Sequence, residues 1–133
     1  GSIRWIPFRD DVWTLYAAAD VAVVPTYYAE GTPKGVLEGM AMARPVVCSD
    51  VPSIRALVSD NHDAKLFRPR DPNALADQVA SLLASSDNRT RLGVAARASA
   101  LARFDANAAA RMAVTKVYAG FLSRAQAAAS SPV

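Results

Sequence analysis

Residues 21–49 have the sequence VAVVPTYYAEGTPKGVLEGMAMARPVVCS. The apolar run Val21–Val24 is too short for a helix and fits a strand that is buried on both faces. A loop at Tyr27–Thr32 follows, and the segment Pro33–Met42 begins with a proline, which suits the first turn of a helix. Pro45–Ser49 is a second candidate for a buried strand. This strand–helix–strand order predicts parallel strands joined by a crossover helix.

The same alternation extends to both sides of this unit. Ile3–Phe8 and Ala64–Phe67 have the short apolar composition of strands. We expect helices at Val12–Ala19 and Ser53–Val58, and Asp10–Asp11 can cap the first of them with acids at the positive end of its dipole. The pattern predicts an α/β fold, an open parallel sheet of about four short strands wrapped by helices.

The second half of the chain is predicted to be entirely helical. Asp71, followed by proline, begins a helix that we expect to run through Leu83. Asp87 or Asn88 would cap the next helix, which ends near Ala102, and a final helix would occupy Asp105–Ala127. The fold is therefore a sheet domain followed by C-terminal helices.

Domain limits follow from these elements. We expect one partial domain at residues 3–127, with a frayed tail at 128–133. Gly1–Ser2 looks like a protease scar from an expression tag. The lone cysteine, Cys48, and the lack of a visible signal peptide favour a cytoplasmic location.

Composition excludes several functional classes. One cysteine excludes an intrachain disulfide framework, and one histidine excludes most zinc sites. A Ser-His-Asp apparatus would depend on His62 alone, which lies in a polar loop and is expected at the surface. Cys48 is expected to be a buried strand residue and not a nucleophile. The net charge is +3, and scattered arginines without aromatic neighbours favour a solvated helix face over a nucleic-acid surface.

The chain has two glutamates. Glu30 lies in a loop that precedes a helix, and Glu38 lies two turns along that helix. A helix N-terminus that follows a parallel strand suits a phosphate, and Gly31 and Gly35 permit close approach of the backbone. Carboxylates would repel a phosphate, but they accept hydrogen bonds well from vicinal sugar hydroxyls. The arrangement predicts a ligand with both hydroxyls and phosphates, such as a nucleotide-sugar.

The segment Glu30–Ala41 with Arg44–Val47 resembles the donor-site motif of the family 4 (group 1) retaining glycosyltransferases of the GT-B fold. That family has Glu-Gly-x-Pro-x-x-x-x-Glu-Ala-Met-Ala, and then Gly-x-Pro-Val-Val. Phe8–Val12, Leu15–Val21 and Asp71–Ala76 also fit the family in its order. The match covers nearly the whole chain, and its combined motifs are specific.

The resemblance implies a fragment of the C-terminal, Rossmann-like donor-binding domain of an enzyme that transfers sugar from a UDP- or GDP-sugar to an acceptor with retention. Glu30 would be catalytic, contacting the transferred sugar near the reacting carbon, and Glu38 would bind the ribose. No metal is implied, because the helix N-terminus and basic residues would stabilise the leaving diphosphate. The other implied donor-binding residues are Gly31, Thr32, Lys34, Gly35 and Val36 for sugar and diphosphate, and Pro7, Phe8 and Arg9 for the base.

Three positions depart from the family pattern. Pro7 stands where the family often has glycine at a strand end, and Gly39 replaces the usual alanine at a cost in helix propensity of roughly 1 kcal/mol. Ala43 replaces the glycine that usually ends this helix. The Glu-Gly-Thr-Pro-Lys variant is similar to members that build bacterial polysaccharides or glycolipids. For the full-length enzyme, peripheral attachment to the inner membrane is an open alternative to a purely cytoplasmic location.

The resemblance begins at the family's third strand of this domain, so the first two strands and the N-terminal acceptor domain are not matched. We expect Val21–Val24 to present an open edge, and the fragment to form homo-oligomers by edge pairing or by exchange of Ile3–Phe8. We also expect the fragment alone to be inactive. A non-catalytic module that binds nucleotide or only self-associates, and a nucleotide-sugar epimerase of the same fold, remain alternative functions.

The candidate site residues can also be explained without a ligand. Glu30 and Glu38 could be solvated acids, and Lys34 could be a solvated side chain or approach a phosphate. Tyr27 and Tyr28 could stack on an acceptor, although we expect one to be packed and the other exposed.

Overall fold

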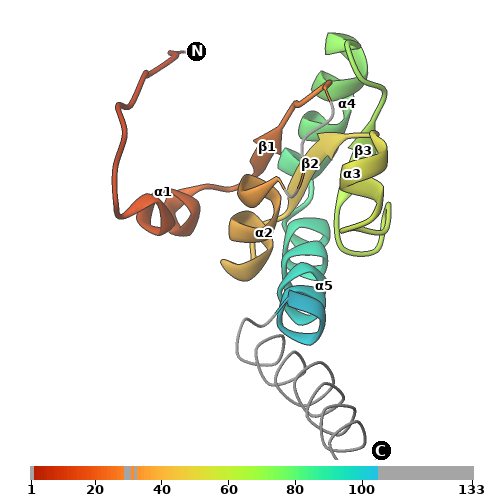
Figure 1. Cartoon of the computed structure of the whole chain (residues 1–133). Coiled ribbons are helices and arrows are strands. Elements are labelled where there is room, and N and C mark those ends of the chain that lie inside the picture. The colour runs from red at the N-terminus through yellow and green to blue at the C-terminus, as the bar shows by residue number, and fades with distance from the viewer. Residues whose placement is uncertain (1, 29–30, 32, 105–133) are drawn as a thin grey trace, which may run out of the picture. The chain divides into compact units, whose positions relative to one another are not determined.

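The computed structural model describes residues 2–28, 31 and 33–104 of the chain. The chain divides into two compact units, Gly1–Ala100 and Leu101–Val133, and the first contains the sheet. The helix expected at Asp105–Ala127 and the tail at 128–133 lie outside the described residues. The elements in chain order are α1 (Val12–Ala18), β1 (Ala22–Val24), α2 (Lys34–Ala41), β2 (Val46–Ser49), α3 (Pro52–Arg55), β3 (Lys65–Phe67), α4 (Pro72–Leu83) and α5 (Ser86–Phe104) (Figure 1).

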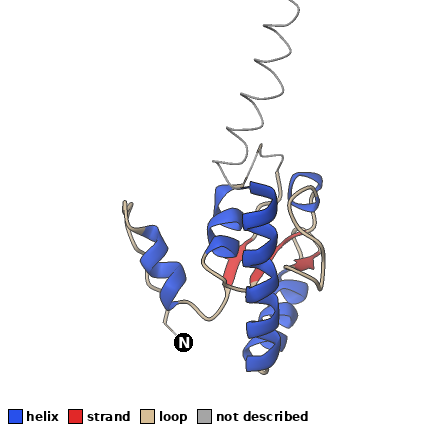
Figure 2. Ribbon diagram, turned by 90° about the horizontal axis from the view of Figure 1, so that it is seen from below, coloured by secondary structure: helices blue, strands red, loops and turns tan. Residues whose placement is uncertain are grey.

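The sheet of the described residues has three parallel strands in the order β1-β2-β3. The central strand β2 is buried at all four positions, because it has a neighbour on each side and helices around it (Figure 2). Val47, Phe67, Leu82 and Leu92 form a buried apolar cluster that joins β2 and β3 to α4 and α5. The predicted α/β class, with a Rossmann-like parallel sheet, is confirmed.

The prediction that Val21–Val24 is buried on both faces was wrong. Ala22 is buried, but the side chain of Val23 is 42% exposed, and Val24 is only partly buried. The physical reason is the position of β1, which pairs with β2 and with no other strand among the described residues. The alternation of buried and exposed side chains is that of an edge strand with one covered face.

The strand predicted at Ile3–Phe8 is absent from the described structure, which therefore has three strands where about four were expected. The segment runs as coil away from the sheet, with Trp5 89% and Phe8 92% exposed (Figure 1). A strand is stabilised by ladder hydrogen bonds and by burial of one face, and this segment has neither. Its apolar composition alone could not supply a partner.

The helix caps were predicted with mixed success. Asp71 accepts a hydrogen bond of 2.9 Å from the Ala74 amide, which confirms it as the cap of α4. Asp11 occupies the cap position of α1, but its carboxylate pairs with Arg9 and not with the helix amides. The expected cap at Asp87 or Asn88 was wrong, because α5 begins earlier. The hydroxyl of Ser85 accepts from the Asn88 amide at 3.2 Å.

The C-terminal end of α2 turns at Ala43, whose φ of 54° lies in the left-handed region that favours glycine. The Ala43 amide donates to the Met40 carbonyl and the Arg44 amide to the Gly39 carbonyl, both at 3.0 Å, which is the pairing of a Schellman turn. Gly93 of α5 packs on this turn so closely that a Cβ there would lie 2.2 Å from the Ala43 carbonyl oxygen. The sheet unit therefore depends on a glycine at position 93.

Gly93→Ala is expected to destabilise the protein by about 2 kcal/mol, although alanine has the higher helix propensity. The added methyl group meets backbone atoms of Ala43, which cannot rotate away as a side chain can. Val94→Ala, at the exposed neighbouring position, is the matched control and should change stability by no more than a few tenths of a kcal/mol. Urea denaturation measures both, and a Gly93→Ala variant as stable as the parent would contradict the packing described.

Candidate functional site

The loop after β1 and the N-terminal end of α2 carry most of the residues expected to meet a ligand. Glu30 and Thr32 lie outside the described residues, so their predicted roles stay predictions. Gly31 is exposed, and a Cβ there would have no atom of the described structure within 4 Å. Lys34 is also exposed, whereas Pro33, predicted in the first helical turn, is the buried residue that precedes α2.

The first amides of α2 differ in availability. The Val36 amide donates to the Pro33 carbonyl at 3.1 Å. The amides of Lys34 and Gly35 donate to no group in the described part of the chain. Two backbone donors are therefore open at the positive end of the α2 dipole, and this is an arrangement that suits an anion.

Glu38 is half-buried in the second turn of α2, where it lies beside Tyr16 of α1. The Tyr16 hydroxyl donates to the Gly35 carbonyl at 3.2 Å. Burial raises the pKa of Tyr16, and the neighbouring Glu38 carboxylate raises it further. Sequence reasoning did not single out Tyr16. The signal was available, because Val12, Leu15 and Tyr16 share the spacing of one helix face.

A cleft of about 360 Å³ joins the predicted base-binding residues to Glu38. Its remaining lining is apolar and comes from Ile6 and from Val12 and Leu15 of α1. Sites for small molecules combine an apolar lining with a few polar groups in the same way. The predicted residues that the structure brings together here are Pro7, Phe8, Arg9 and Glu38.

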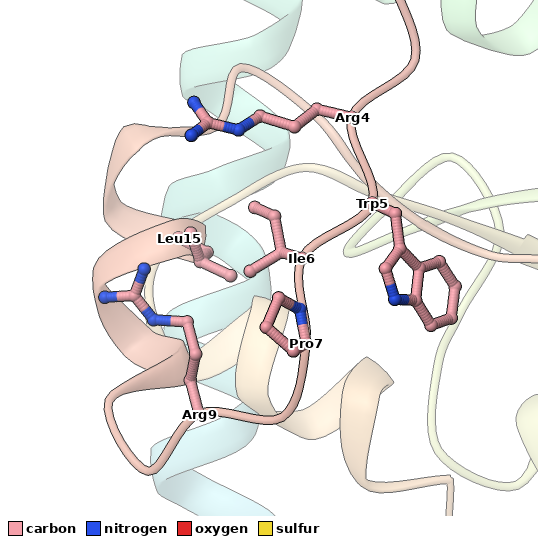
Figure 3. Close-up of a pocket in the computed structure, with 6 residues that line it drawn as sticks. All are labelled: Arg4, Trp5, Ile6, Pro7, Arg9 and Leu15. Carbon is pink, nitrogen blue, oxygen red and sulfur yellow. The ribbon is translucent and has the colours of Figure 1, made fainter.

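A second hollow, of about 410 Å³, shares Ile6, Pro7, Arg9 and Leu15 with this cleft. Figure 3 shows the guanidinium groups of Arg4 and Arg9 on the same side as Leu15, while the Trp5 ring points the other way. The wall next to the cleft is therefore basic at two points.

The two arginines differ in charge environment. Arg9 holds the Asp11 carboxylate through two hydrogen bonds, of 2.7 and 2.6 Å, and this pairing keeps the pKa of Asp11 below its usual range. Both groups are exposed, so the pair is screened by solvent and partly neutralises Arg9. Arg4 has no ion-pair partner in the part of the chain that the structure describes.

The other residues discussed from the sequence fall outside this cleft. Cys48 is buried in β2 as predicted, and burial raises the pKa of its thiol to about 12, which disfavours the nucleophilic thiolate. His62 is at the surface as predicted. Tyr27 and Tyr28 are 55% and 59% exposed, so the expectation that one would be packed was wrong. Both side chains follow β1, which is an edge strand of the sheet formed by the described residues.

Two general features concern metals and membranes. No group of three or more His, Cys, Asp or Glu side chains in residues 2–28, 31 and 33–104 is placed to hold a metal ion. No helix in those residues is long and apolar enough to cross a membrane.

Comparison with known proteins identifies the class. Residues 1–85 match the family model described as glycosyl transferases group 1, and the chain belongs to this family. It is 35% identical over 105 residues to the phosphatidyl-myo-inositol mannosyltransferase of Mycobacterium leprae, covering 77% of this chain and 28% of that protein. It is 39% identical over 83 residues to the D-inositol 3-phosphate glycosyltransferase of Xylanimonas cellulosilytica, covering 62% of this chain and 20% of that protein.

Solved structures of other proteins share the fold of this chain. HepE of Anabaena in complex with UDP-glucose superposes with a TM-score of 0.79 at 22% identity, covering 84% of this chain and 31% of HepE. Sucrose-phosphate synthase of Thermosynechococcus elongatus superposes with a TM-score of 0.71 at 33% identity, covering 90% of this chain and 28% of the synthase. The chain spans less than a third of each of these proteins.

The geometry around Glu38 predicts the titration of Tyr16. Its pKa should lie above 10, and Glu38→Gln should lower it without restoring the ordinary value, because burial is the larger cause. The raised pKa means that the folded state holds the phenol proton of Tyr16 more tightly than the unfolded state does. The free energy of unfolding should therefore be highest below pH 10, and should fall as the pH rises from 10 through the raised pKa.

The ring carbons of labelled tyrosine, followed by NMR across pH, measure this titration. Asp11→Asn is the control, because Asp11 is not among the causes of the Tyr16 shift. A Tyr16 pKa that does not respond to Glu38→Gln would contradict the placement of the two side chains.

Proposed function

We propose that this chain is the donor-binding part of a longer glycosyltransferase that transfers sugar from a UDP- or GDP-sugar to an acceptor with retention. The observation that carries the proposal is the cleft in which Glu38 faces Pro7, Phe8 and Arg9, beside open amides at the N-terminus of α2. Relatives named for inositol and phosphatidyl-inositol glycosylation, and HepE bound to UDP-glucose, support a nucleotide-sugar donor and a role in bacterial polysaccharide or glycolipid synthesis.

Glu38 would accept hydrogen bonds from the two vicinal hydroxyls of the ribose. The Tyr16 side chain lies beside this carboxylate, and its hydroxyl proton is donated to the Gly35 carbonyl of the same helix. The exposed Phe8 ring, with Pro7 and the Arg9 stem, would provide the apolar surface for the base. The half-buried carboxylate would thus bind the polar ribose, and the exposed apolar side chains would contact the base.

The diphosphate would lie at the N-terminus of α2. Negative charge develops on it as the bond to the sugar breaks, and the amides of Lys34 and Gly35 with the α2 dipole would stabilise that charge. Gly31 permits close approach of the sugar, and the Lys34 side chain adds a cation. Glu30, with Thr32, would contact the transferred sugar. This scheme needs no metal, and it is compatible with a cytoplasmic enzyme or one attached peripherally to the inner membrane.

Two alternative functions stay open for experiment. A non-catalytic module would bind a nucleotide, or only self-associate, and the longer protein would transfer no sugar. A nucleotide-sugar epimerase of the same fold would change the donor sugar and leave an added acceptor untouched. Product analysis of the full-length protein with UDP- and GDP-sugars separates these outcomes.

Substitution of the two glutamates in the full-length enzyme should affect different kinetic constants. Glu38→Gln should raise the KM for the donor about tenfold, because a charge-assisted acceptor for the ribose is lost. Glu30→Gln should lower kcat about a hundredfold with a smaller change in KM, because its contact matters most near the transition state. Steady-state kinetics with both variants measure this, and the 133-residue chain alone should transfer no sugar. Unchanged kcat and KM in both variants would contradict the assignment of Glu30 and Glu38 to the donor site.

We also propose that the chain alone self-associates through the free edge of β1, by pairing of edges or by exchange of Ile3–Phe8 between copies. Among the described residues β1 has one neighbouring strand, and Ile3–Phe8 has none. An unpaired edge next to exposed apolar side chains, Trp5 and Phe8 among them, is a template for a second chain.

Light scattering at micromolar concentration should show dimers or larger species of the chain. Val23→Lys places a charge on the exposed face of β1 and should shift the protein to the monomer. Val94→Lys adds the same charge at an exposed position of α5 and should leave the oligomer intact. A parent chain that is a stable monomer would contradict self-association.

A further inference from the structure

Arg70 lies in the turn between β3 and α4 and has a φ of 62°, in the left-handed region where glycine or asparagine is favoured over arginine. The turn is held on both sides. The Asp71 amide donates to the Arg68 carbonyl at 3.3 Å, and the Asp71 carboxylate caps α4. Strain that the surroundings maintain points to a role for the side chain it carries.

That side chain reaches the loop after β1. The guanidinium carbon of Arg70 lies 4.9 Å from the centroid of the Tyr27 ring, which is the geometry of a cation–π contact. Tyr27 in turn meets Tyr28 edge to face, with ring centroids 5.6 Å apart and an interplanar angle of 87°. Because β1 and β3 are not neighbours in the sheet, this contact joins segments that follow two different strands on either side of β2.

The contact lies on exposed side chains, so it contributes little to the core of the fold. Its place in the chain suggests another use. Tyr27 stands three residues before Glu30 in the segment that joins β1 to α2, and the turn carrying Arg70 is anchored to β3 and α4. A rigid turn can therefore hold the beginning of the loop that carries the proposed catalytic glutamate.

We infer that Arg70 is a positioning residue, which acts through the Tyr27 ring to orient the β1–α2 loop for sugar transfer. This rests on the proposed function. Arg70 would contact neither the nucleotide nor the reacting sugar, so its removal should lower kcat and leave the KM for the donor unchanged. The Tyr27 ring, and not its hydroxyl, is the group that the guanidinium uses.

The kinetic test uses Arg70→Asn in the full-length enzyme, because asparagine accepts the left-handed backbone and lacks the guanidinium. We expect kcat to fall about three- to fivefold with an unchanged KM. Tyr27→Leu should have the same effect, the double variant no more than either single one, and Tyr27→Phe none. Equal kcat in Arg70→Asn and the parent, or additive losses in the double variant, would overturn the inference.

A second readout needs no catalysis. In NMR spectra of the 133-residue chain, Arg70→Asn should shift the Tyr27 ring signals and the amides that follow Tyr27, while Arg91→Asn on α5 should not. The melting temperature of Arg70→Asn should not fall below that of the parent, because asparagine accepts the left-handed backbone and the Arg70 side chain lies outside the buried core. If the full-length protein transfers no sugar, the proposed function fails, and unshifted Tyr27 signals would separately contradict the contact on which the inference depends.

Discussion

The close approach of α2 to the sheet at Gly39 is the constraint on which the site depends. A Cβ at this position would lie 3.0 Å from a methyl carbon of Val46 and 3.3 Å from the Ala22 Cβ, tighter than ordinary van der Waals contact. The glycine that weakens the helix by roughly 1 kcal/mol in propensity thus allows α2 to lie against β1 and β2. Its neighbour Glu38 lines the cleft together with residues of α1.

Two arginines hold the ends of the helices that form this arrangement. The Arg44 guanidinium donates to the Ala19 carbonyl at 3.2 Å, at the end of α1, and Arg97 donates to the Ala41 carbonyl at 3.0 Å, at the end of α2. Cations at helix C-termini satisfy open carbonyls and oppose the negative end of the dipole. The positions of α1 and α2, which both line the cleft, therefore depend on these contacts at their C-termini.

The sequence was sufficient to predict an element where its local pattern agrees with its tertiary environment. The run that forms β2, the Asp71–Pro72 start of α4 and the glycine-rich opening of α2 each contain their own physical reason. It was insufficient for Ile3–Phe8, since strand formation depends on a partner that composition does not reveal. The roles of Tyr16 and Arg70 were also missed, because each depends on a contact with a distant segment, α2 for Tyr16 and the β1–α2 loop for Arg70.

We propose that Glu38 and the segment before α1 receive the nucleotide of the donor. A crystal structure of the full-length enzyme with UDP or GDP tests this most directly. The ribose hydroxyls should lie within hydrogen-bond distance of the Glu38 carboxylate, with the base against Pro7, Phe8 and Arg9. A nucleotide bound elsewhere, with Glu38 facing only Tyr16 and solvent, would contradict it.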